Sequence, residues 1–170
     1  MNSADIRLPR PARELPKVAI AAFLFSGAML LGAYAFEFIG GLAPCQMCYW
    51  QRWAHWAVLA FALLTFAAPR AGAPLVALGL AGSAGVAAYH AGVEYGWWQG
   101  PQSCTATGES LDGIDPAAIL GGLSEPMSGV DCSEPAWSML GISMAGWNGL
   151  LSLGALVVVL VLMKQMRARS

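Results

Sequence analysis

The sequence predicts an all-α membrane protein, a four-transmembrane-helix bundle with a long disulfide-bearing outer loop between helices 3 and 4. Three observations lead to this fold class. The chain of 170 residues is 57% hydrophobic and only 11% charged, whereas soluble domains are about 25% charged. Long apolar runs follow one another along the chain. Nearly all basic residues fall on one side of these runs if the runs cross a bilayer alternately.

Each apolar run is long enough to cross the hydrocarbon core of a bilayer, which takes about 20 residues. The first run could instead be a cleaved signal peptide, but it is longer than a typical signal core and further runs follow it. A turn is expected at Pro69-Arg70-Ala71-Gly72. One membrane domain is therefore predicted over 1–170. Its parts are a cytoplasmic tail at 1–17, transmembrane helices at about 18–39, 45–68, 73–98 and 142–163, and an outer loop at 99–136.

The basic residues set the expected orientation. There are nine of them: Arg7, Arg10, Arg13, Lys17, Arg52, Arg70, Lys164, Arg167 and Arg169. All except Arg52 fall on one side, which the positive-inside rule makes cytoplasmic, together with both termini. The loop at 99–136 has six acidic residues and no basic residue, so it is expected to face the periplasm. The net charge of -1 gives no global field that would attract nucleic acid.

A Cys-x-x-Cys pair, Cys45 and Cys48, lies where a polar hinge enters the second apolar run. A thiol at a helix N-terminus has its thiolate favoured by the helix dipole and by a nearby cation. Arg52 is such a cation, one turn beyond Cys48 on the same face. A charge inside an apolar helix indicates function by default. The pattern predicts a redox-active pair; the alternatives are a structural disulfide that pins the hinge and an arginine that snorkels to the headgroups.

Two further cysteines, Cys104 and Cys132, lie on the outer loop. All four cysteines are thereby expected on the oxidising side of the membrane, where disulfides persist. A structural zinc site would favour two closely spaced pairs, and positions 104 and 132 are far apart. No metal site is predicted. If Cys104 and Cys132 form a disulfide, this bond constrains the loop and can also be reduced, as an electron relay requires.

Other polar groups inside the apolar runs are secondary candidates. His55 and His90 could each donate a hydrogen bond to a carbonyl ligand, or could join helices as ordinary interhelical contacts. Glu37 and Glu94 lie near outer helix ends, where both could face headgroups and Glu94 could relay protons. Met144, at the outer end of the fourth run, is kept as a site candidate.

Several stretches together resemble the DsbB family, bacterial disulfide bond formation proteins. The resemblance covers nearly the whole chain after residue 17, with all four cysteines in order. It is carried by Leu42-Ala43-Pro44-Cys45-x-x-Cys48-x-x-x-Arg52, by the stretch from His90 through Gly100-Pro101 to Cys104, and by Cys132 with Trp137, Leu140-Gly141 and Met144 through Trp147.

The resemblance implies an inner-membrane protein-dithiol:quinone oxidoreductase. Such an enzyme reoxidises DsbA, a soluble periplasmic thioredoxin-fold oxidant, and reduces a membrane quinone, either ubiquinone or menaquinone. By match of motif, the partner would attack Cys104, which would form the loop disulfide with Cys132. Cys45 would then exchange with this loop pair. Cys48 would contact the quinone, and Arg52 would stabilise both the thiolate and the ring oxygen.

His90 and Met144 match positions near the quinone in that family. Two other classes of function stay open from the residues alone. One is a non-enzymatic membrane scaffold with structural disulfides, and the other is a metal-binding membrane protein. Both predict that the chain does not oxidise thiols in a quinone-dependent reaction.

Overall fold

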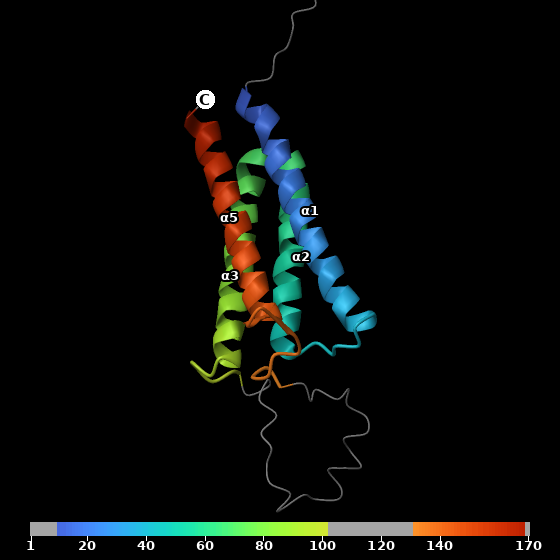
Figure 1. The fold of residues 1–170 in the computed structure, drawn as a ribbon. Coiled ribbons are helices and arrows are strands. Elements are labelled where there is room, and N and C mark those ends of the chain that lie inside the picture. Colours follow the sequence, from blue (N-terminus) through green and yellow to red (C-terminus); the bar gives the residue numbers. More distant parts are fainter. Residues whose placement is uncertain (1–9, 102–130, 169–170) are drawn as a thin grey trace, which may run out of the picture.

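The computed structural model describes residues 10–101 and 131–168, and within these ranges four long helices lie side by side (Figure 1). Cys104, most of the outer loop and the first nine residues fall outside the described residues. The helices are α1 (Arg10–Phe38), α2 (Gln46–Ala67), α3 (Pro69–Glu94) and α5 (Met144–Ala168), and the strands are β1 (Ser138–Met139) and β2 (Ile142–Ser143). The two strands form an antiparallel pair just before α5.

The segments that lead into α2, out of α3 and into α5 lie at the same end of the bundle. Helix α2 packs between α1 and α3, and α3 also packs on α5. In Figure 1 the start of α1 and the end of α5 lie at one end, and the hinge before α2, the end of α3 and the strand pair lie at the other. Cys45, at the start of α2, is therefore far from the two outer ends of the described chain.

Three helical segments are long and apolar enough to cross a membrane: Pro16–Phe38, Pro69–Glu94 and Met144–Met166. The prediction of a helical protein with membrane-length helices is confirmed to this extent. Helix α2 is not among the three, and polar side chains interrupt its first half. These side chains are Gln46, Gln51, Arg52 and His55. That all four helices span the bilayer stays a prediction.

The bundle exposes many large apolar side chains, and its interior combines an apolar core with buried polar side chains. Leu24, Leu31 and Leu78 are 65%, 73% and 65% exposed. The interior includes a group of fully buried polar side chains: Ser26, Ser83 and Ser152. In water this arrangement would be unfavourable, but in lipid the outer apolar surface costs nothing and interhelical hydrogen bonds replace water.

Helix α1 begins earlier than the sequence indicated. The chain was expected to be a tail up to residue 17, yet it is helical from Arg10 and continues through Pro16. Hydropathy marks where a chain leaves lipid, whereas a helix can extend further because water satisfies its terminal groups. The tail is thus shorter than predicted, and α1 projects beyond the apolar segment.

The expected turn at residues 69–72 is instead the first turn of α3. Pro69 occupies the first helical turn, a position where its fixed φ and missing N–H cost little. Only Ala68 separates α2 from α3. A Cβ at Gly72 would lie 2.5 Å from the backbone of Thr65, so glycine permits the close approach of the two helices there. At its other end α3 stops at Glu94, and the expected extension to residue 98 is not helical.

The short strand pair was not predicted and sets the start of α5. Its turn is Leu140-Gly141, with φ of 56° and 77°, as required by the two-residue turn that suits the twist of paired strands. The hydroxyl of Tyr95 donates to the carbonyl of Gly141 at 3.2 Å, which ties this turn to the end of α3. Helix α5 consequently begins at Met144, close to the hinge before α2.

Candidate active site

Cys45 and Cys48 stand together at the N-terminus of α2. Cys45 is the N-cap residue, and its sulfur accepts a hydrogen bond from the backbone N–H of Cys48. The two Sγ atoms lie 3.0 Å apart and both thiols are unbridged. Since a disulfide bond measures about 2.05 Å, closing or opening this bond needs a movement of only about 1 Å. The pair is therefore placed for reversible disulfide formation.

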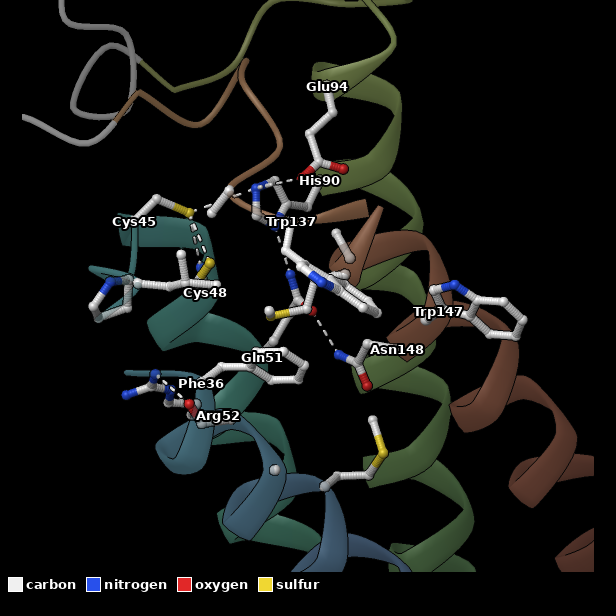
Figure 2. Close-up of a pocket in the computed structure, with 18 of the residues that line it drawn as sticks. Phe36, Cys45, Cys48, Gln51, Arg52, His90, Glu94, Trp137, Trp147 and Asn148 are labelled. Carbon is white, nitrogen blue, oxygen red and sulfur yellow. Dashed lines mark hydrogen bonds and ion pairs between the residues drawn. The ribbon is translucent and has the colours of Figure 1, made fainter. Parts of the chain in front are cut away.

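The sulfur pair opens onto an apolar cavity of about 340 Å³ (Figure 2). Its walls come from the four described helices, the hinge before α2 and the segment before α5. The rings of Phe36 and Trp137 form part of the wall, with their centroids 5.1 Å apart. Such a cavity suits a flat, mostly apolar molecule with few polar groups.

The structure brings most of the predicted site residues to this cavity. Its lining includes Cys45, Cys48, Arg52, His90 and Met144. Cys132 is fully buried behind the cavity wall, in an apolar cluster with Cys45, Met47 and Val93 against which Cys48 also packs. Cys104 lies outside the described residues. One of the two loop cysteines is thus seated against the helical pair.

Arg52 is bound to α1. Its guanidinium forms an ion pair with Glu37 and lies over the rings of Tyr34 and Tyr49, at 4.7 Å and 5.5 Å from their centroids. It also donates to the carbonyl of Ala33 at 3.4 Å. Only 8% of the surface of Arg52 is exposed, so its side chain is buried inside the bundle. Glu37, one of the two carboxylates that could have faced headgroups, supplies the countercharge.

Glu37→Gln is expected to destabilise the protein, because a buried guanidinium would lose its ionic partner. Hydrogen bonds to charged groups contribute about 2 kcal/mol, so the midpoint of thermal unfolding in detergent should fall measurably. The exposed carboxylate Glu134 offers a matched control, since Glu134→Gln should leave the midpoint unchanged. An equal midpoint for the wild type and Glu37→Gln would mean that the ion pair adds nothing to stability.

His90 reaches the sulfur pair from α3, as Figure 2 shows. Its Nε2 lies 3.5 Å from the Sγ of Cys45 and 3.8 Å from a carboxylate oxygen of Glu94. On the other side of the ring, Nδ1 lies 2.6 Å from the Nε2 of Gln51. Gln51 in turn accepts a hydrogen bond of 2.6 Å from the side-chain amide of Asn148. A continuous line of polar side chains thus runs from Cys45 into the bundle.

His55 lies deeper on α2 and joins all the other described helices. Its Nδ1 meets the hydroxyl of Ser26, and its Nε2 meets the carbonyl oxygen of Asn148 at 2.9 Å and the hydroxyl of Ser83 at 3.2 Å. Arg52 is not a member of this group, because its guanidinium contacts Glu37 and Ala33 of α1. Among the described residues, no buried side-chain nitrogen or oxygen lacks a hydrogen-bond partner. The reading of His55 as an interhelical contact therefore fits the geometry.

Gln51 and Asn148 were overlooked in the sequence, although a signal existed. Both are polar amides inside apolar helices, and the rule that drew attention to Arg52 applies equally to them. Phe36 carried no such signal, because an aromatic ring in an apolar segment is ordinary. Its place on the cavity wall depends on the angle at which α1 meets α5.

One possible metal-ligand group exists within the described ranges. Cys45, Cys48 and His90 offer two sulfurs and a nitrogen that lie within 4.8 Å of one another. Sulfur and imidazole ligands of this kind suit zinc. A ring nitrogen of His90 is available as a ligand only when it carries no proton.

The chain is similar to known proteins over most of its length. The profile of the family described as "Disulfide bond formation protein DsbB" matches residues 16–162. The chain is 33% identical over 146 residues to disulfide bond formation protein B of Methylococcus capsulatus, covering 79% of this chain and 85% of the relative. The protein of the same name from Azoarcus sp. is 30% identical over 154 residues, covering 88% and 90%. No solved structure matches.

A third relative, disulfide bond formation protein B of Albidiferax ferrireducens, is 32% identical over 142 residues, covering 81% of this chain and 79% of the relative. The profile match includes the hinge, the sulfur pair, the cavity walls and Cys132. The resemblance read from the motifs is thereby confirmed over most of the chain. The three membrane-length helices and the family match together indicate a multi-pass helical membrane protein, with a thiol pair at a helix N-terminus. The chain belongs to the DsbB family of disulfide bond formation proteins.

Proposed function

We propose that this chain is a protein-dithiol:quinone oxidoreductase of the bacterial inner membrane. It reoxidises a soluble periplasmic thioredoxin-fold dithiol oxidase, a DsbA-like protein, and passes the electrons to ubiquinone or menaquinone. The observation that carries the proposal is the unbridged pair of Cys45 and Cys48, whose sulfurs open directly onto an apolar cavity. Thiol chemistry and a site for a lipid-soluble acceptor are thus adjacent.

The lining of the cavity supports the assignment of a quinone ring to it. The aromatic side chains of Phe36 and Trp137 suit a flat ring. Arg52 and Met144, which line the cavity, would hold the head group, Cys48 would face it, and the His90 ring would lie beside it. A bound quinone supplies the sink for two electrons and two protons that disulfide formation releases. Glu37 keeps Arg52 compensated and oriented in the absence of any ligand.

Exchange among the cysteines would carry the electrons to this cavity. Attack by the partner on Cys104 of a Cys104–Cys132 disulfide would release Cys132 as a thiolate. That thiolate would attack Cys45 of a Cys45–Cys48 disulfide, and Cys48 would leave as a thiolate beside the cavity. Each exchange breaks one S–S bond and forms another, so electrons leave the chain only at the quinone. The burial of Cys132 against Cys45 supports this route, because the two residues belong to one apolar cluster.

The proposed orientation places the sulfur pair at the periplasmic face and both termini in the cytoplasm, with α1, α2, α3 and α5 all spanning the bilayer. Two observations support it. The start of α1 and the end of α5 lie at the end of the bundle opposite to Cys45 (Figure 1). Eight of the nine basic residues fall on that side if the four helices cross alternately.

Catalytic oxidation of a reduced thioredoxin-fold partner by the purified protein tests the proposal. In detergent with added quinone, partner dithiol should disappear and quinol should appear in equal amounts over many turnovers. Omission of quinone should stop the reaction after the disulfides in the protein are used. A scaffold or a metal-binding protein would show neither turnover nor dependence on quinone, and that outcome would overturn the proposal.

A further inference from the structure

We propose that Gln51 and Asn148 are positioning residues that hold His90 in the tautomer protonated on Nε2, so that its N–H points at the sulfur of Cys45. The inference deepens the proposed function, and rests on it only for the exchange step that this N–H assists. Neither amide belongs to the cysteine pair or touches its sulfurs. Their contribution lies in the direction of the hydrogen bonds that link them to His90.

Asn148 sets the donor–acceptor direction of these hydrogen bonds. Its Oδ1 accepts from the hydroxyl of Ser152 at 3.2 Å and lies 2.9 Å from the Nε2 of His55. Its amide nitrogen therefore points the other way, and donates to Oε1 of Gln51 at 2.6 Å. With its oxygen so engaged, Gln51 turns its own amide nitrogen toward Nδ1 of His90, again at 2.6 Å. An amide nitrogen can only donate, so Nδ1 accepts, and the proton of a neutral ring must lie on Nε2.

Burial keeps this direction fixed. Gln51, Asn148 and His90 are 8%, 7% and 3% exposed, so water cannot take over either end of an amide. If Gln51 alone were turned over, its amide nitrogen would face that of Asn148, and two donors would meet without an acceptor. Unpaired polar groups are costly in a buried site. The hydrogen bonds along this line of side chains must therefore all reverse their donor–acceptor direction together, or none of them can.

Glu94 favours the same tautomer independently. One carboxylate oxygen lies 3.8 Å from Nε2 of His90, and the other accepts a hydrogen bond from the hydroxyl of Ser143. The side chain of Glu94 is only 5% exposed, so solvent screens its charge weakly. A carboxylate beside Nε2 favours a proton there over a lone pair. Two separate contacts, one on each ring nitrogen, thus agree.

The N–H on Nε2 lies 3.5 Å from the sulfur of Cys45, within the range of hydrogen bonds to sulfur. In the later exchange that re-forms the loop disulfide, the thiolate of Cys104 attacks Cys132 in a Cys45–Cys132 disulfide, so the Cys45–Cys132 bond breaks and Cys45 leaves as a thiolate with the electron pair. One S–S bond forms as one breaks, and no proton or net electron is transferred. A hydrogen bond donated to that thiolate stabilises it and speeds its departure.

The same tautomer disfavours zinc at this site. A histidine that binds zinc offers a ring lone pair to the metal and donates its other N–H to an acceptor. Here Nε2 faces the sulfurs with a proton, and Nδ1 faces the amide donor of Gln51. The group of Cys45, Cys48 and His90 has ligand atoms close enough for a metal, but its imidazole is protonated on the wrong nitrogen.

Nuclear magnetic resonance of ring nitrogens tests the tautomer directly. The chain has two histidines, so isotope labelling of histidine nitrogen gives two sets of signals, and His90→Gln identifies one of them. We expect wild-type His90 to be protonated on Nε2 and unprotonated on Nδ1. Gln51→Glu offers Nδ1 an acceptor and should leave that nitrogen protonated. Thr65→Ala removes a hydrogen bond elsewhere on α2, from its hydroxyl to the carbonyl of Phe61, and should keep the wild-type signals. Wild-type His90 protonated on Nδ1 would overturn the proposal.

The reactivity of Cys45 tests the consequence. In a chain with Cys48, Cys104 and Cys132 changed to serine, the rate of reaction of Cys45 with dithiodipyridine reports how readily its thiolate forms. Gln51→Leu or Asn148→Leu should lower this rate about tenfold, as expected for a lost hydrogen bond to a charged group. Thr65→Ala is the matched control and should react at the parent rate. Equal rates in all variants would overturn the proposal, and because neither test uses quinone or partner, that result would leave the proposed function standing.

Discussion

Cys48→Ser is expected to abolish quinone-dependent oxidation of the dithiol partner, with turnover lower by at least about a thousandfold. Cys48 lines the cavity beside the place proposed for the quinone ring, and it is the only cysteine of α2, with its sulfur 3.0 Å from that of Cys45. Serine cannot form the disulfide, so electrons delivered to Cys45 would have no path to the acceptor. The measurement is quinol formation by the purified protein with a reduced thioredoxin-fold partner.

Cys45→Ser provides the paired comparison. It should be equally inactive, but it keeps a sulfur beside the cavity. Added quinone should then give a visible charge-transfer absorption with the Cys48 thiolate, and Cys48→Ser should give none. Turnover by Cys48→Ser within tenfold of the wild type would show that the pair at α2 is a structural disulfide.

Cys132→Ser is expected to trap a mixed disulfide between Cys104 and the thioredoxin-fold partner. Once the partner has attacked Cys104, the sulfur released at position 132 should pass to Cys45, against which it packs. Serine at 132 cannot take that role, so the adduct persists and turnover stops. The adduct should appear on a non-reducing gel as a band of the summed mass and vanish on reduction.

Cys104→Ser distinguishes the two loop cysteines in this experiment. It should form no adduct, because the partner would lack its point of attack. An adduct carried by Cys132 instead would reverse the assignment of the two cysteines. If neither variant captured the partner, a scaffold with structural disulfides would be the better description of the chain.

Features that depend on local sequence were predictable. The Cys-x-x-Cys pair, its place at the start of α2 and the membrane-length helices follow from spacing and hydropathy, both of which are read within a single segment. The helix boundaries were less predictable from the sequence. Pro69 terminates one helix and begins the next without a loop, and proline is compatible with both a turn and a first helical turn.

Features that depend on how the helices face one another were not predictable. Glu37 and Arg52 lie on different helices, and nothing in the sequence states that the angle of α1 brings them together. The same holds for Asn148, which meets Gln51 across the bundle. Helices in lipid have no strong polar and apolar faces to fix their rotation, so the partners of buried polar groups emerge only in the folded bundle.

The single residue between α2 and α3 has a mechanical consequence. Ala68 donates to the carbonyl of Leu64, and its own carbonyl accepts from the N–H groups of Ala71 and Gly72, so the link has no slack. This link and the packing of α2 against α3 favour movement of the two helices as one unit, with Cys45 at the start of α2 and His90 near the end of α3. The hinge at 39–44, where Gly41 adopts a φ of 67°, connects this unit to α1. On the proposed route, Cys132 needs little displacement to reach Cys45, because both are buried in one cluster on this unit.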